Sequence, residues 1–134
     1  MILRVLPAVL LSWAAACGPD PALQQAEHTT RVVANALSEV QAARTSGGED
    51  PGSGELGDAL ERAEDRLSDA EQTVDLWQET GAGRLGWETI APCLAAALAD
   101  VEAGLEASGR SVSAELGQAR TMAESASERT CGRR

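Results

Sequence analysis

Hydrophobic residues recur along most of the chain at alternating spacings of three and four, which is the period of an α-helix with one buried face. Four stretches show this pattern, and none alternates with the period of two expected of a half-buried strand. The buried positions expected in the first two stretches are Leu23, Ala26, Thr30, Val33, Leu37 and Val40, then Leu56, Leu60, Ala63, Leu67, Ala70, Val74 and Trp77. Those expected in the last two are Ile90, Leu94, Leu98, Val101 and Leu105, then Val112, Leu116, Ala119, Ala123 and Ala126. The pattern predicts an all-α protein.

Residues that typically begin and end helices lie at the ends of these stretches. Asp20 followed by Pro21 is typical of an N-cap and a first helical position. Thr89 or Ser111 could cap later helices. A glycine follows the last periodic turn of each stretch, where a residue without a Cβ can adopt the left-handed conformation that ends a helix. These glycines are Gly47, Gly81, Gly109 and Gly132.

The connections between the four predicted helices are short. Residues 46–53 are rich in glycine, serine and acidic residues and are expected to form a flexible linker, whereas 81–88 and 108–110 are expected to form tighter connections. Short connections favour antiparallel neighbours, so the simplest arrangement is an up-down-up-down four-helix bundle. With about 26 residues in each of the first two helices and about 20 in each of the others, one end of the bundle should protrude.

The side chains available for the core are small. The chain has three Trp but no Phe or Tyr, and its hydrophobic residues are mainly Ala, Leu and Val. Small side chains bury little area at ~25 cal/mol per Å², so modest stability is expected unless a covalent bond adds to it. The formal net charge of −10 leaves no basic face for phosphates, which makes nucleic acid a poor candidate partner.

The amino terminus has the layout of a signal peptide. Arg4 is followed by an apolar run at 5–13 and by the small residues that precede Cys17. This run is shorter than the about 20 residues that a permanent membrane-spanning helix needs. The sequence Ala14-Ala15-Ala16-Cys17 resembles the lipobox of bacterial lipoproteins, and the resemblance covers residues 1–17 only. It implies cleavage after Ala16 and a diacylglyceryl group on Cys17, although the same alanines also fit an ordinary A-x-A cleavage site.

The resemblance implies a protein anchored in the bacterial cell envelope. By analogy with bacterial sorting rules, Gly18 directly after the cysteine favours the outer membrane over the inner membrane. The expected organisation is a signal peptide at 1–16, a lipidated cysteine with a very short tether at 17–19, a helical domain at 20–131 and a basic tail at 132–134.

Cys93 and Cys131 can pair with each other once Cys17 is assigned to lipid attachment. Cys93 follows Pro92 near the start of the third predicted helix, and Cys131 lies at the end of the fourth, so an antiparallel pair brings them to one end. Their distances from the intervening turn differ by about six residues, or roughly 9 Å of helix rise, so a bond requires the last turn of the fourth helix to fold back. Outside the cytoplasm, we expect a structural disulfide rather than a reactive thiol.

The remaining candidate residues favour no catalytic, metal or cofactor site. His28, the only histidine, is expected on the outward face of the first helix. Trp77 is expected in the core, whereas Trp87 either covers the open end of the bundle or stays exposed as an interaction anchor. The sequence favours a noncatalytic, membrane-tethered module that binds an envelope protein or itself. The alternative is a carrier or sensor whose interior holds a small apolar ligand against Trp77 or Trp87.

Overall fold

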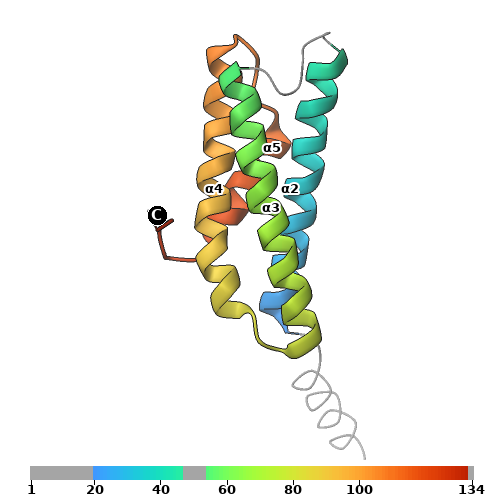
Figure 1. Cartoon of the computed structure of the whole chain (residues 1–134), viewed down its shortest axis with the longest axis vertical. Helices are drawn as coiled ribbons and strands as arrows, with labels where there is room; N and C mark the ends of the chain where they lie inside the picture. The colour runs from blue at the N-terminus through green and yellow to red at the C-terminus, as the bar shows by residue number, and fades with distance from the viewer. Residues whose placement is uncertain (1–19, 47–53, 133–134) are drawn as a thin grey trace, which may run out of the picture.

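The computed structural model describes residues 20–46 and 54–132, which form four α-helices (Figure 1). The helices are α2 (Pro21–Ser46), α3 (Gly54–Thr80), α4 (Arg84–Ala107) and α5 (Ala114–Ser125). No strand occurs within the described residues. The predicted all-α class and four-helix bundle are therefore confirmed.

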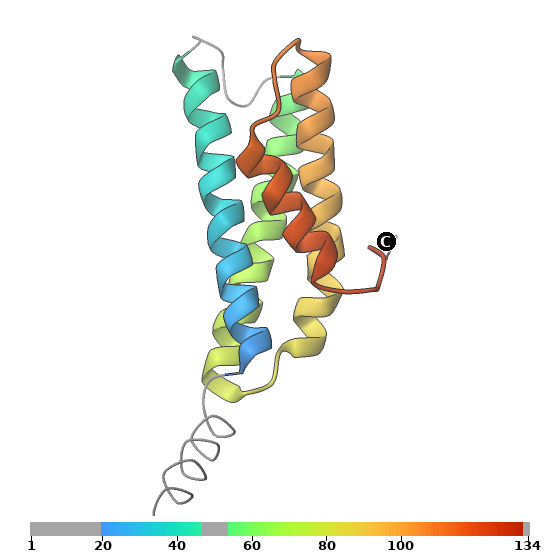
Figure 2. The ribbon, with the colours of Figure 1, turned by 180° about the vertical axis from the view of Figure 1, so that it is seen from behind.

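The helices are arranged so that each one packs mainly against two others. α3 and α4 make the most extensive contact, α5 packs against α4 and α2, and α2 packs against α3. In Figures 1 and 2, α2 and α4 run away from the end of the bundle at which α2 begins, and α3 and α5 run toward it. We call this end, which also contains the short connection from α3 to α4, the Asp20 end.

Several helix boundaries follow the local rules that the sequence indicated. The carboxylate Oδ1 of Asp20 accepts a hydrogen bond of 2.9 Å from the Ala22 N–H, so Asp20 caps α2 as predicted. Gly81 and Gly109 follow α3 and α4 with φ angles of 74° and 76°, the left-handed conformation expected of them. Gly47 lies outside the described residues.

α4 starts earlier than its sequence pattern indicated. The expected connection 81–88 is reduced to residues 81–83, and Thr89 lies inside the helix instead of capping it. The cause is a close approach to the preceding helix: a Cβ added to Gly83 would lie only 2.6 Å from the Cβ of Trp77. Because glycine lets the backbone pack directly on α3, the chain reverses within three residues and the next helix begins at once.

α5 starts later and ends much sooner than expected. Its N-cap is Ser113 rather than Ser111, and the Ser113 hydroxyl accepts a hydrogen bond of 3.1 Å from the Leu116 N–H. The helix has 12 residues and ends at Ser125, so Gly132 does not terminate it. The chain beyond α5 instead crosses toward α4 (Figure 2).

The core consists mainly of alanine, leucine and valine. Every position predicted to be buried in α3 is buried. Four positions predicted for the other helices are only half-buried, namely Leu23, Ile90, Val112 and Ala126. The helices approach closely where residues are small: a Cβ on Gly104 of α4 would lie 3.2 Å from Leu56 Cδ1 of α3. The absence of a Cβ at Gly104 thus lets the backbones of α3 and α4 approach each other closely.

The bundle has four helices over part of its length and three at the Asp20 end. α5 has 12 residues, whereas α2, α3 and α4 have 26, 27 and 24. Three helices therefore extend past α5 at the Asp20 end (Figure 2), whereas the sequence predicted that only the first two would be the longer ones. Trp77 near the end of α3 and Trp87 near the start of α4 are only 3% and 4% exposed. These large indole side chains fill the core at the end that α5 does not reach.

Candidate functional site

The predicted lipid-attachment residue, Cys17, lies outside the described residues. Asp20, three positions later, caps the first helix of the bundle. Three residues span at most ~11 Å even when fully extended, so any group attached to Cys17 is held close to the Asp20 end.

Cys93 and Cys131 form a disulfide, as predicted, with their Cα atoms 4.6 Å apart. The expected mismatch in helix rise is absent because α5 ends at Ser125 and residues 126–131 cross to the side of α4 (Figure 2). Cys131 therefore lies in a segment beyond the last helix, which corrects its predicted position at the end of that helix. The bond fastens the segment that follows α5 to α4.

Trp87 is not an exposed interaction anchor. Only 4% of its surface is exposed, so that prediction is wrong and the alternative, a residue that covers the end of the core, is correct. The early start of α4 explains the difference, because it places Trp87 in the first turn of a helix, facing the interior, rather than in a loop. Trp77 is buried as predicted.

No metal site is formed by the part of the chain that the structure describes. Within residues 20–46 and 54–132, no group of three or more His, Cys, Asp or Glu side chains is placed to hold a metal ion. His28 is exposed on α2, on the outward face expected for it. Among the described helices, none is both long enough and apolar enough to cross a membrane.

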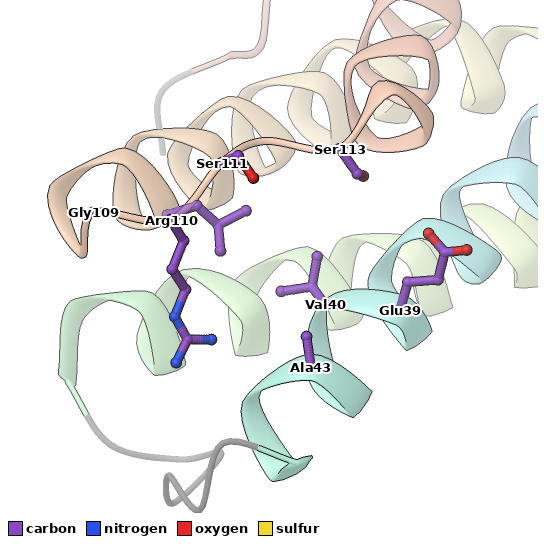
Figure 3. Close-up of a pocket in the computed structure, with 8 residues that line it drawn as sticks. Glu39, Val40, Ala43, Gly109, Arg110, Ser111 and Ser113 are labelled. Atoms are coloured by element: carbon purple, nitrogen blue, oxygen red, sulfur yellow. The ribbon is translucent and has the colours of Figure 1, made fainter.

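A hollow of about 470 Å³ lies at the end of the bundle opposite the Asp20 end (Figure 3). It is formed by the C-terminal half of α2 and the connection between α4 and α5. Charged, hydroxyl and apolar side chains line it, from Glu39, Val40, Ala43, Leu105, Gly109, Arg110, Ser111 and Ser113. The sequence did not reveal this site because its residues come from segments that only the bundle brings together.

The polar groups of this hollow include one carboxyl group with an unusual environment. The pKa of Glu39 is raised above its ordinary range, chiefly because its carboxyl group shares a hydrogen bond with that of Glu115 on α5, with smaller effects from desolvation and charge repulsion. Both residues are exposed, so the pair does not form the enclosed carboxyl dyad that acid-base catalysis needs. The shared hydrogen bond instead links α2 to α5.

Arg120 of α5 bonds to two carboxylates, Glu102 on α4 and Glu124 on α5 itself. Its Nε donates to Glu102 Oε1 and its Nη1 donates to Glu124 Oε1, each at 2.6 Å. These hydrogen bonds raise the pKa of Arg120, which keeps the guanidinium charged. The spacing of Arg120 and Glu124 was visible in the sequence as an i, i+4 pair, but the contact with Glu102 depends on the packing of α5 against α4.

Three further hollows lie along the outside of the bundle. Their volumes are about 350 Å³ between α2 and α3, about 520 Å³ between α3 and α4, and about 390 Å³ beside the segment that follows α5. The acidic residues that line them are Glu27, Glu71 and Asp75, then Glu55, Asp58 and Asp100, then Glu88 and Glu128. Neither Trp77 nor Trp87 lines any of the four hollows, so these spaces do not supply the tryptophan-lined ligand site of the carrier alternative.

No protein-family model matches the sequence, and neither a curated protein nor a solved structure matches it. A functional conclusion therefore depends on the residues and the geometry of this chain alone.

Proposed function

We propose that the protein is a lipid-anchored, noncatalytic helical module of the bacterial cell envelope that binds another envelope protein or itself. The observation that carries the proposal is Ala14-Ala15-Ala16-Cys17, which follows a cationic start and a short apolar run. The thiol of Cys17 carries the lipid, and Gly18 after it favours the outer membrane.

The short distance between Cys17 and the bundle supports a domain held directly against the membrane. Only Gly18 and Pro19 separate the cysteine from the cap of α2. Multiple acyl chains hold a protein firmly, since each buried CH₂ contributes ~0.8 kcal/mol. Removal of Arg4 with the signal peptide changes the formal charge from −10 to about −11, which disfavours a bundle that lies flat on anionic headgroups. An upright bundle directs the mixed polar and apolar hollow at its opposite end away from the membrane, where a partner can reach it.

Substitution of the lipid-accepting cysteine tests the proposal. We expect Cys17→Ser to move the protein from the membrane fraction to the soluble fraction after signal cleavage, and to abolish incorporation of a labelled fatty acid. The matched control is the Cys93→Ser/Cys131→Ser variant, which lacks the other two thiols and should keep both the label and the membrane association.

Two results would contradict the proposal. One is membrane retention of the cleaved Cys17→Ser protein. The other is an intact mass of the wild-type mature protein that corresponds to an unmodified Cys17, as ordinary signal-peptidase cleavage would produce.

A further inference from the structure

Two large hydrophobic side chains are exposed in the described part of the chain, and both lie at the Asp20 end. Leu76 and Leu85 are 53% and 61% exposed. Leu76 lies four residues before the end of α3 at Thr80, and Leu85 is the second residue of α4. An isolated exposed leucine is ordinary on a soluble protein. Two that come from different helices and fall at the same end need an explanation.

Neither leucine belongs to the core at this end. Trp77 and Trp87, which follow Leu76 and Leu85 closely in the sequence, are buried and belong to the core. Gly86 packs against α3, where an added Cβ would lie 3.1 Å from Thr73 Cγ2. The two leucines thus project from a closely packed framework, and folding of the bundle does not account for their hydrophobic character.

The charged groups nearby do not suit an electrostatic contact with anionic lipid. Arg84, the cation next to Leu85, forms an ion pair with Glu88, with 3.3 Å between Nε and Oε1. Glu79 in the last turn of α3 is exposed and acidic. Association of this end with a surface must therefore come mainly from apolar contact.

We propose that Leu76 and Leu85 insert into the boundary between headgroups and acyl chains of a phospholipid membrane, so that the bundle stands on its Asp20 end. This inference rests on the proposed lipid anchor, because Cys17 lies at most ~11 Å of extended chain from Asp20 and so brings this end to the bilayer. Leu76 lies about 6 Å of helix rise from the end of α3. That distance is within the ~5–10 Å by which the apolar side chains of interfacial helices enter the membrane.

The tryptophans of the mature protein provide a test that needs no added label. Trp77 and Trp87 remain after removal of a signal peptide that contains Trp13, and both lie near the leucines along the chain. We would incorporate the full lipoprotein into phosphatidylcholine vesicles that contain lipid brominated near the carboxyl end of its acyl chains, and measure quenching of tryptophan fluorescence. Quenching is expected for the wild type and should decrease strongly in the Leu76→Ser/Leu85→Ser variant.

A control variant separates insertion from a general effect of substitution. Ala107→Ser changes an exposed residue at the end of α4 away from the Asp20 end and should be quenched as strongly as the wild type. Circular dichroism establishes that each variant remains helical. If the wild type stays on the vesicles without quenching, or if the double variant is quenched equally, the inference is wrong while the lipid anchor stands. If the wild type does not stay on the vesicles, the proposed function itself fails.

Discussion

Glu39 and Glu115 show how one pair of side chains makes a helix contact sensitive to pH. The shared hydrogen bond needs a proton, and it raises the pKa of Glu39 above the value of about 4.3 expected in an unfolded chain. The folded state therefore binds this proton more tightly than the unfolded state does. The resulting contribution to stability is complete below the unfolded pKa and is lost as the pH rises through the raised pKa of the folded protein.

We predict that Glu39→Gln stabilises the protein at pH 7 and loses this advantage in acid. At pH 7 the substitution removes a repulsive charge and leaves an amide that can donate to Glu115. In acid, wild-type Glu39 holds the proton of the shared hydrogen bond, so the substitution no longer removes a charge there and its advantage disappears. Thermal unfolding from pH 3 to pH 8 measures the difference. Glu61→Gln, which changes an exposed acidic residue of α3, controls for net charge, and an equal gain from both variants would contradict the prediction.

The contact between Gly83 and Trp77 makes a second prediction at the residue scale. Gly83→Ala should destabilise the protein by about 1–3 kcal/mol, because the new Cβ would overlap the Cβ of Trp77 and force the connection away from α3. Gly117→Ala is the matched control: a Cβ there meets no atom within 4 Å, and alanine in a helix should stabilise by about 0.5–1 kcal/mol. Urea unfolding compares the two variants. Equal free energies of unfolding would show that the close approach of Gly83 is not required.

At the scale of elements, α5 depends most on its surroundings. A helix of 12 residues is marginal in isolation, so its order must come from packing and from its links to other helices. Leu116, Ala119 and Ala123 are buried, and Arg120 bonds to Glu102 of α4. The disulfide beyond the C-terminus of α5 closes a loop with a sequence separation of 38.

We predict that removal of the disulfide weakens α5 before it affects the rest of the bundle. The free energy of unfolding of the Cys93→Ala/Cys131→Ala variant should be about 4 kcal/mol lower in the chain-entropy model, because its unfolded chain is no longer restricted by the closed loop. Hydrogen exchange should become faster in α5 than in α3 and α4, where the helix contacts are most extensive. Chemical reduction of the wild type should reproduce the effect. Unchanged protection of α5 in both experiments would show that its packing alone holds it.

At the scale of the whole molecule, the two ends of the bundle differ in construction. The Asp20 end has three helices, two buried tryptophans and two exposed leucines. The opposite end has the connection between α4 and α5 and the hollow lined by charged, hydroxyl and apolar groups. Under the proposed function, the end with the exposed leucines faces the membrane and the end with the mixed polar and apolar hollow faces a partner. The same short α5 that leaves one end with three helices also frees the following segment to reach Cys93.

The sequence by itself determined the features that depend on a few neighbouring residues or on a regular period. Asp20 as a helix cap, the turns at Gly81 and Gly109, and the buried face of α3 were all predictable. They depend on local hydrogen bonds, on the absence of a Cβ and on the helical repeat. The pairing of Cys93 with Cys131 was also predictable once Cys17 was assigned to lipid. Cys17 itself remains a prediction from sequence.

Tertiary structure decided which helix ends extend and which side chains are covered. Local patterns placed Thr89 at a helix start and left Trp87 either buried or exposed. The close approach of Gly83 to α3 instead lets α4 start earlier, and the indole of Trp87 is buried as a result. The hollow near Glu39 was likewise invisible in the sequence, since its walls come from separate segments. The physical reason is that capping and periodicity act over a few residues, whereas burial and side-chain contacts depend on groups that are distant along the chain and become neighbours only after the helices pack.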